Sequence, residues 1–143
     1  SADLIIFSMG SLYTSILPHL ICKKIIDTID HSKAKLMYLC NAMTQPGETD
    51  HFGVSDHVKL LNEYLGKKKV DVVVASNTKI DETIARKYES EEQKDPVFID
   101  RKELSNMNLE LLEDDLLTLA EDGTLKHNGL KLSSIIFSYL MRD

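Results

Sequence analysis

The feature that most limits how this chain can fold is a set of three short, unbroken apolar runs, each followed by a more polar segment. The runs cover residues 3–7, 35–40 and 70–75. Each is continuous rather than alternating in hydrophobicity, which is typical of strands buried on both faces of a sheet. Because helical segments separate these strands, we predict an α/β fold with a parallel sheet covered on both faces.

Two helices are predicted between these runs. Apolar residues recur at helical spacing from 16 to 29, so one helix is expected there, with Thr14 or Ser15 as its N-cap. Ser55 is expected to cap a second helix, which Gly66 ends. The strand–helix pair therefore occurs twice in succession, and right-handed crossovers between the parallel strands are expected.

The second half of the chain is less regular. Thr78-x-x-Asp81 resembles a capping box and is expected to open a short helix that runs to Tyr88. A charged connector over 89–95 and a short fourth strand over 96–99 should follow. Residues 104–126 are Leu-rich but poorly periodic, so only short elements are predicted there. Apolar spacing from 132 to 140 predicts a final amphipathic helix.

Charge and composition exclude several functional classes. The 143 residues include 17 Lys and Arg against 23 Asp and Glu, a formal net charge of −6. This acidic balance argues against nucleic-acid binding, because neutralising phosphates needs clustered basic side chains. No apolar stretch approaches the roughly 20 residues that span a bilayer, so no membrane partner is expected. Cys22 and Cys40 lack metal-ligand spacing and are expected to be reduced and buried, as in a cytoplasmic protein.

The chain reaches its first strand-like run at residue 3, without an initiator methionine. We therefore expect residues 1–143 to form a single, partial α/β domain that is a piece of a longer protein. The sheet of such a piece would have an uncovered edge, and exposed edges promote association between chains. A homo-oligomer is the expected result.

Three loops are expected at the carboxyl ends of the strands, where open parallel sheets bind ligands. They cover residues 8–15, 41–54 and 76–81 and are rich in Gly, Ser, Thr and Asn. The first leads into a helix, so it is either an anion site or a simple helix cap. The second is unusually long, which favours a ligand loop over a self-satisfied surface loop. Its Glu48 and Asp50 could hold a metal ion or accept hydrogen bonds from hydroxyl groups.

Other polar residues lack the pattern of a catalytic centre. Consecutive helical residues point in different directions, so Ser55-Asp56-His57 cannot form a catalytic triad. The acidic residues 113–115 are interpreted as solvated caps. Lys126 precedes a helix N-terminus, which a nearby anionic ligand or an outward-pointing side chain would explain. No activated nucleophile is recognisable, so catalytic residues stay unknown, no metal ligand is assigned, and binding is favoured over catalysis.

Three motifs carry a family resemblance. They are Gly-Ser-Leu-Tyr-Thr-Ser-Ile-Leu-Pro at 10–18, Asn-Ala-Met-Thr-Gln-Pro-Gly-Glu-Thr-Asp at 41–50 and Ser-Asp-His-Val at 55–58. Together they closely resemble the gluconeogenesis-factor (YvcK-type) family, which is related to 2-phospho-L-lactate transferase. Tyr88-x-x-Glu91 and the Lys-His-Asn at 126–128 resemble later landmarks of that family.

The resemblance implies a Rossmann-like three-layer α/β domain about twice this length, of which this chain resembles the C-terminal half. The N-terminal half, with its glycine-rich nucleotide loop, would be absent. The implied function is UDP-sugar binding by a regulatory gluconeogenesis factor that supports cell shape and cell-wall metabolism. The alternative is a 2-phospho-L-lactate transferase-like enzyme of deazaflavin cofactor synthesis, which acts on a nucleotide-activated donor and uses Mg²⁺ as a candidate cofactor.

The resemblance also implies which residues bind the nucleotide-sugar. Eight of them lie in the first two loops, and two more would sit near the nucleotide. In order along the chain they are Gly10, Ser11, Thr14, Asn41, Thr44, Gly47, Glu48, Thr49, Tyr88 and Lys126.

Overall fold

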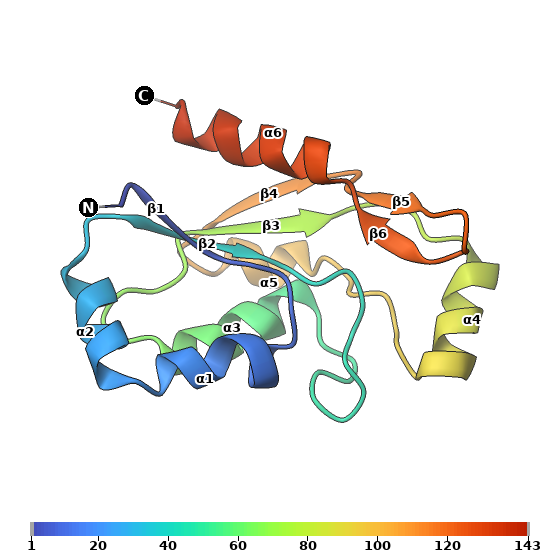
Figure 1. The fold of residues 1–143 in the computed structure, drawn as a ribbon, viewed down its shortest axis with the longest axis horizontal. Coiled ribbons are helices and arrows are strands. Elements are labelled where there is room, and N and C mark those ends of the chain that lie inside the picture. The colour runs from blue at the N-terminus through green and yellow to red at the C-terminus, as the bar shows by residue number, and fades with distance from the viewer. Residues whose placement is uncertain (1, 143) are drawn as a thin grey trace.

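The centre of the molecule is a parallel sheet of four strands in the order β1-β2-β3-β4. A computed structural model describes residues 2–142 of the chain (Figure 1). The sheet strands are β1 (Leu4–Phe7), β2 (Lys35–Leu39), β3 (Val72–Ser76) and β4 (Glu110–Asp114). A two-stranded antiparallel ribbon follows, formed by β5 (Leu117–Leu119) and β6 (Leu125–His127). The predicted parallel α/β sheet is confirmed.

Helices cover both faces of the sheet, which gives three layers (Figure 1). One face packs against the helices at the bottom of the view, and α6 lies alone across the other. The helices are η1 (Leu12–Ile16), α1 (Leu17–Leu20), α2 (Lys23–His31), α3 (Val54–Tyr64), α4 (Glu82–Glu92), α5 (Arg101–Ser105) and α6 (Gly129–Leu140). Among residues 2–142, no helix has the length and apolar character needed to cross a membrane.

The central strands are buried on both faces, as their continuous apolar sequences predict. In β2, Leu36 and Tyr38 pack into the layer of η1, α1 and α3, whereas Met37 and Leu39 pack against α6. The first strand departs from the prediction. It pairs with β2 on one side, and Ile6 is 40% exposed. Position at the sheet edge, and not strand composition, decides its burial.

The first predicted helix is divided into η1, α1 and α2. Its N-cap is Ser11, whose Oγ accepts a hydrogen bond from Thr14 N at 3.2 Å; neither Thr14 nor Ser15 caps it. Pro18 lies in the first turn of α1 and has no N–H to continue the preceding helix. The backbone then becomes extended at Cys22, which separates α1 from α2. Cys22 is exposed, contrary to prediction, whereas Cys40 is buried.

The ends of α3 also differ from the prediction. Its N-cap is Gly53, whose N–H donates to the Asp56 carboxylate at 2.9 Å, and Ser55 lies within the helix. Gly66 directly follows the C-cap Leu65, but its φ is not positive, so it does not end the helix through a left-handed conformation. A Cβ at Gly66 would lie 2.3 Å from Asp30 Oδ2. Glycine is needed there for space.

The second half of the chain differs from the prediction in three further ways. Asp81, not Thr78, is the N-cap of α4, and this helix continues to Glu92 through the expected connector. Residues 96–99 do not join the sheet and form an isolated antiparallel bridge between Met43 and Pro96. The backbone of this segment bonds to Ala42 and Val54 instead of to β3, and the fourth strand of the sheet is β4.

Candidate functional site

The first two loops are joined directly at the carboxyl edge of the sheet. The Asn41 side chain makes two hydrogen bonds with Gly10: its Oδ1 accepts from Gly10 N at 2.9 Å, and its Nδ2 donates to Gly10 O at 2.8 Å. Beside this pair, Ser11 Oγ donates to Glu48 Oε2 at 2.5 Å. Four residues from the resemblance-based site are thus brought together, and we call the Asn41–Gly10 pair the loop clamp.

The loop clamp limits what the first loop can offer to an anion. Gly10 N is bonded to Asn41, Thr14 N to Ser11 Oγ, and Ser15 N to Ser11 O at 2.9 Å. Three backbone amides at this helix start therefore already donate to groups of the protein. For these amides the structure favours the helix cap over the anion site. The Glu48 carboxylate adds negative charge at the same place.

Two other site candidates are buried within the second loop. Thr44 and Thr49 are each 1% exposed. Thr49 Oγ1 accepts from Gln45 N at 2.8 Å, and Thr44 Oγ1 accepts from Asp95 N at 2.9 Å. These hydroxyl groups therefore maintain the loop conformation. Gly47 has a φ of +75° in the turn between them, a conformation that favours glycine.

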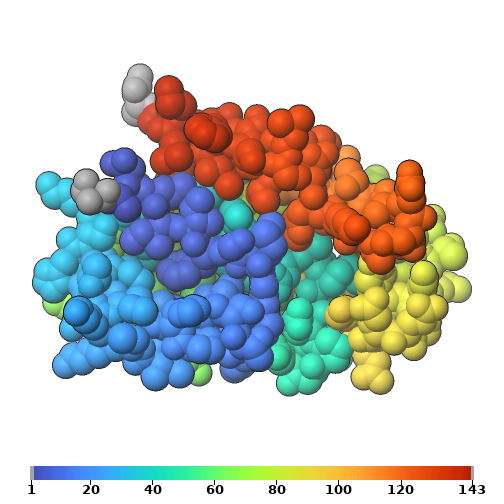
Figure 2. Space-filling view, viewed as in Figure 1, coloured from blue at the N-terminus to red at the C-terminus, as the bar shows by residue number. Residues whose placement is uncertain are grey.

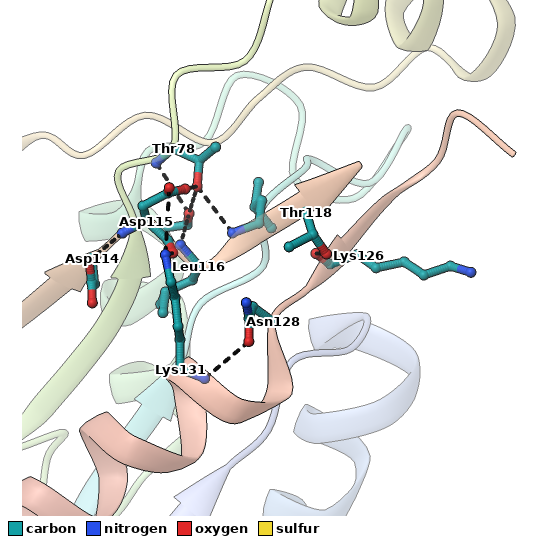
Figure 3. A network of polar contacts seen from close by, with 10 residues as sticks. Thr78, Asp114, Asp115, Leu116, Thr118, Lys126, Asn128 and Lys131 are labelled. Carbon is teal, nitrogen blue, oxygen red and sulfur yellow. Dashed lines mark hydrogen bonds and ion pairs between the residues drawn. The ribbon is translucent and has the colours of Figure 1, made fainter. Parts of the chain in front are cut away.

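The remaining candidates form contacts other than the two hydrogen bonds of the loop clamp. Tyr88 is buried on α4, and its hydroxyl accepts a hydrogen bond from Leu125 N at 2.8 Å, which ties α4 to β6. Lys126 extends away from the neighbouring polar contacts (Figure 3) and forms a 3.9 Å ion pair with Asp122. Thr14 is exposed on η1. Tyr88 and Lys126 therefore both lie at β6, where the Tyr88 hydroxyl bonds to the residue that precedes Lys126.

Two pockets flank the loop clamp. The first, of about 310 Å³, lies between the end of β3 and residues 96–101, and we call it the Phe98 pocket. The second, of about 240 Å³, is lined by Gly10, Asn41, Gln45 and His127, and we call it the His127 pocket. Both are lined by Asn41, Ala42 and Leu117, so they adjoin one another. Partial burial lowers the pKa of His127 and favours its neutral ring.

The family model for 2-phospho-L-lactate transferase CofD matches residues 1–117 of the chain. The chain belongs to the CofD family. It is 43% identical over 139 residues to the gluconeogenesis factor of Bacillus subtilis, a match that covers 97% of this chain and 43% of that protein. It is 42% identical over 139 residues to a putative gluconeogenesis factor of Thermotoga maritima, with 94% of this chain and 43% of that protein covered.

The fold of the CofD family is confirmed by a solved structure. The crystal structure of protein BH3568 from Bacillus halodurans superimposes with a TM-score of 0.87 at 36% identity. The match covers 95% of this chain and 43% of that chain. The chain therefore spans less than half the length of these CofD-family relatives.

A polar network in this CofD-family chain was not anticipated from the sequence (Figure 3). Thr78 Oγ1 donates to Asp115 Oδ1 at 2.5 Å and accepts from Leu117 N at 3.1 Å. Lys131 Nζ donates to Asp115 O at 2.9 Å. The hydrogen bond from Thr78, with the nearby Lys131 charge, lowers the pKa of Asp115. The network holds the β5–β6 ribbon over the two pockets, so residue 115 is not a merely solvated cap.

Glu113, another acidic residue that was predicted to be a solvated cap, is held by hydrogen bonds within the protein. Arg101 donates to Glu113 through Nε at 2.9 Å and through Nη2 at 2.7 Å. Asn77 Nδ2 donates to the same carboxylate at 3.2 Å. The Arg101 hydrogen bond is the main cause that lowers the pKa of Glu113. No local sequence pattern marks this contact, because Asn77 follows β3 and Glu113 lies on β4, a strand that the sequence did not predict.

The segment Ser55-Asp56-His57 forms no triad, as predicted. Ser55 Oγ donates to Asp100, and Asp56 caps α3. His57 is buried, and its Nδ1 lies 2.8 Å from Gly53 O. Burial lowers the pKa of His57. Within residues 2–142, no group of three or more His, Cys, Asp or Glu side chains is arranged to hold a metal ion.

Proposed function

We propose that this chain forms part of a UDP-sugar-binding gluconeogenesis factor that acts in the cytoplasm to regulate cell shape and cell-wall metabolism. The family and the identity of its relatives support this proposal. The observation that carries it is the loop clamp, which joins two loops at the carboxyl edge between two adjoining pockets. This is where an open parallel sheet binds its ligands.

The polar groups around the His127 pocket suit a sugar better than a bare phosphate. The described side chains there include Gln45, Asn41 and a His127 whose ring is favoured in its neutral form. Glu48, held by Ser11 beside the clamp, is an acceptor for hydroxyl groups. We therefore propose that sugar hydroxyls bind in the His127 pocket and that the diphosphate needs a cation or further residues to neutralise it.

A transferase acting on a nucleotide-activated donor is the second candidate. The description of the family model favours it. The residue that supports the transferase candidate is Glu48, because a carboxylate beside the diphosphate would suit a bridging Mg²⁺ ion. Such an ion would neutralise phosphate charge during group transfer.

Titration of the full-length protein with UDP-N-acetylglucosamine, with and without Mg²⁺, tests the proposal. Calorimetry and amide NMR shifts should report binding at residues 8–11 and 41–48. Glu48→Gln keeps an acceptor for Ser11 but removes the charge. If Mg²⁺ bridges the ligand, the variant should lose any Mg²⁺ dependence; if Glu48 binds hydroxyls, the loss should be about tenfold or less in both buffers. Absence of shifts at millimolar ligand would refute the proposal.

A further inference from the structure

Phe98 is an exposed aromatic side chain in the wall of a pocket. It is 57% exposed, although most large apolar side chains nearby are at least partly buried. Its ring packs directly against Gly53, where a Cβ would lie 2.9 Å from the ring atoms Cε2 and Cζ. Gly53 has a φ of −84°, which any residue can adopt, so glycine is needed there only for space. The backbone of Gly53 therefore sets where the Phe98 ring lies.

The strand-like segment that carries Phe98 is fixed on both sides. Val97 N donates to Ala42 O at 2.9 Å, and Val54 N donates to Phe98 O at 3.0 Å. The segment thus connects the second loop with the start of α3. A fixed backbone and a packed ring mean that this wall is formed before any ligand binds.

The rest of the Phe98 pocket combines apolar surface with a few immobilised polar groups. Ile80, Pro96 and Leu117 are among its apolar residues. Arg101 and Asn77 also line it, and both are held on the Glu113 carboxylate. Asn77 carries both a donor and an acceptor in its amide, and Arg101 has N–H groups beyond the two that Glu113 accepts. Such a mixture suits a flat ring with polar edges.

We propose that the Phe98 pocket binds a planar heteroaromatic ring, the nucleobase of the ligand, stacked on Phe98. At about 310 Å³ the pocket lies at the lower end of the roughly 300–1,000 Å³ typical of small-molecule sites. It therefore takes a base and its ribose, and the remainder of the ligand passes Asn41 and Ala42 into the His127 pocket. This inference deepens the proposed function and rests on it for the identity of the ligand.

Uridine, which lacks phosphates and the second sugar, is the probe for the ring site. Amide NMR titration of the 143-residue chain should show shifts at residues 76–78 and 96–99. Phe98→Leu keeps an apolar side chain but removes the ring, and should weaken uridine binding by about tenfold. Phe98→Tyr keeps the ring and should bind within about twofold of the wild-type chain. Because Phe98 is exposed, both variants should fold.

Phe137→Leu is the matched control, since Phe137 is 66% exposed on α6, which lies on the other side of the sheet from α3. It should leave uridine binding unchanged. Gly53→Ala provides a second variant, because the added Cβ would lie 2.9 Å from the ring; it would lie equally close to Asp100 Oδ2, so urea unfolding must first show that the variant is as stable as the wild-type chain. It should weaken uridine binding in the same direction as Phe98→Leu.

The outcomes separate this inference from the proposed function. Equal binding of UDP-N-acetylglucosamine by the wild-type chain and Phe98→Leu would overturn the ring site and leave the proposed function standing. Phe98-dependent binding of uridine, with no added affinity for the UDP-sugar, would support the ring site and refute the proposed function. If neither compound shifts residues 76–78 or 96–99, the ring site is overturned.

Discussion

Asn41 should hold the first two loops together through two hydrogen bonds to one glycine. Replacing Asn41 with Ala removes both bonds and leaves Gly10 N and Gly10 O without this partner. A net contribution of about 1 kcal/mol for each bond predicts a loss of about 2 kcal/mol in the free energy of unfolding. Because Asn41 is only partly buried, little further loss from an internal cavity is expected.

Asn41→Asp is the nearly isosteric companion variant. Its carboxylate still accepts from Gly10 N, but a second oxygen replaces the Nδ2 that donates to Gly10 O at 2.8 Å. One bond is lost and two acceptors face each other, so the variant should be destabilised at neutral pH by an amount similar to that of Asn41→Ala. Protonation of the new carboxyl group would restore a donor, so its stability deficit should shrink as the pH falls.

Urea unfolding followed by circular dichroism measures the global effect, and hydrogen exchange at the Gly10 amide measures the local one. Asn62→Ala is the control, because Asn62 Oδ1 accepts a single hydrogen bond from Val70 N at 2.9 Å away from the two pockets. It should lower stability by about 1 kcal/mol without changing exchange at Gly10. If both Asn41 variants unfold like the wild-type chain and Gly10 exchange is unchanged, the loop clamp does not hold the loops.

Three further predictions concern other parts of the molecule. A thiol reagent at pH 8 should label Cys22, which is exposed, and spare Cys40, whose pKa burial raises to about 12; mass spectrometry of the labelled peptides checks this, and labelling of both in the folded chain would contradict it. Gly66→Ala should cost about 1–3 kcal/mol in urea unfolding, because its Cβ would meet the Asp30 carboxylate, and an unchanged midpoint would count against this packing. The chain should self-associate through the edge strand β1, which lies beside α6 and its exposed apolar side chains (Figure 2). Sedimentation that shows only monomer at high concentration would refute this.

The sheet was predictable because the continuous apolar sequence of its central strands indicates that they are buried on both faces. The apolar runs that became β2 and β3 specify strands buried on both faces, and parallel pairing then brings the following loops to one edge. The β1 run has the same character, yet its edge position leaves Ile6 exposed. Burial at an edge depends on what neighbours the strand, which local sequence does not encode.

The incorrect predictions concern segments in which contacts with residues distant in sequence decide the structure against the local sequence pattern. Pro96-Val-Phe-Ile99 has strand-like composition, but the segment bonds to the second loop through Ala42 and does not enter the sheet. Thr78 has the spacing of an N-cap, but its hydroxyl bonds to Asp115, 37 residues away. The Phe98 pocket could not be anticipated for the same reason, since its walls come from four separate stretches of the chain.

The β5–β6 ribbon is tied at both of its sides. The Tyr88 hydroxyl binds Leu125 N on β6, while Thr78 binds Leu117 N on β5 and Asn128 N donates to Leu116 O at 2.7 Å. We therefore expect the ribbon to stay in place, instead of opening as a gate, when a ligand reaches the pockets. The observed association rate of a small ligand should therefore rise linearly with its concentration, without the plateau that a slow opening step imposes.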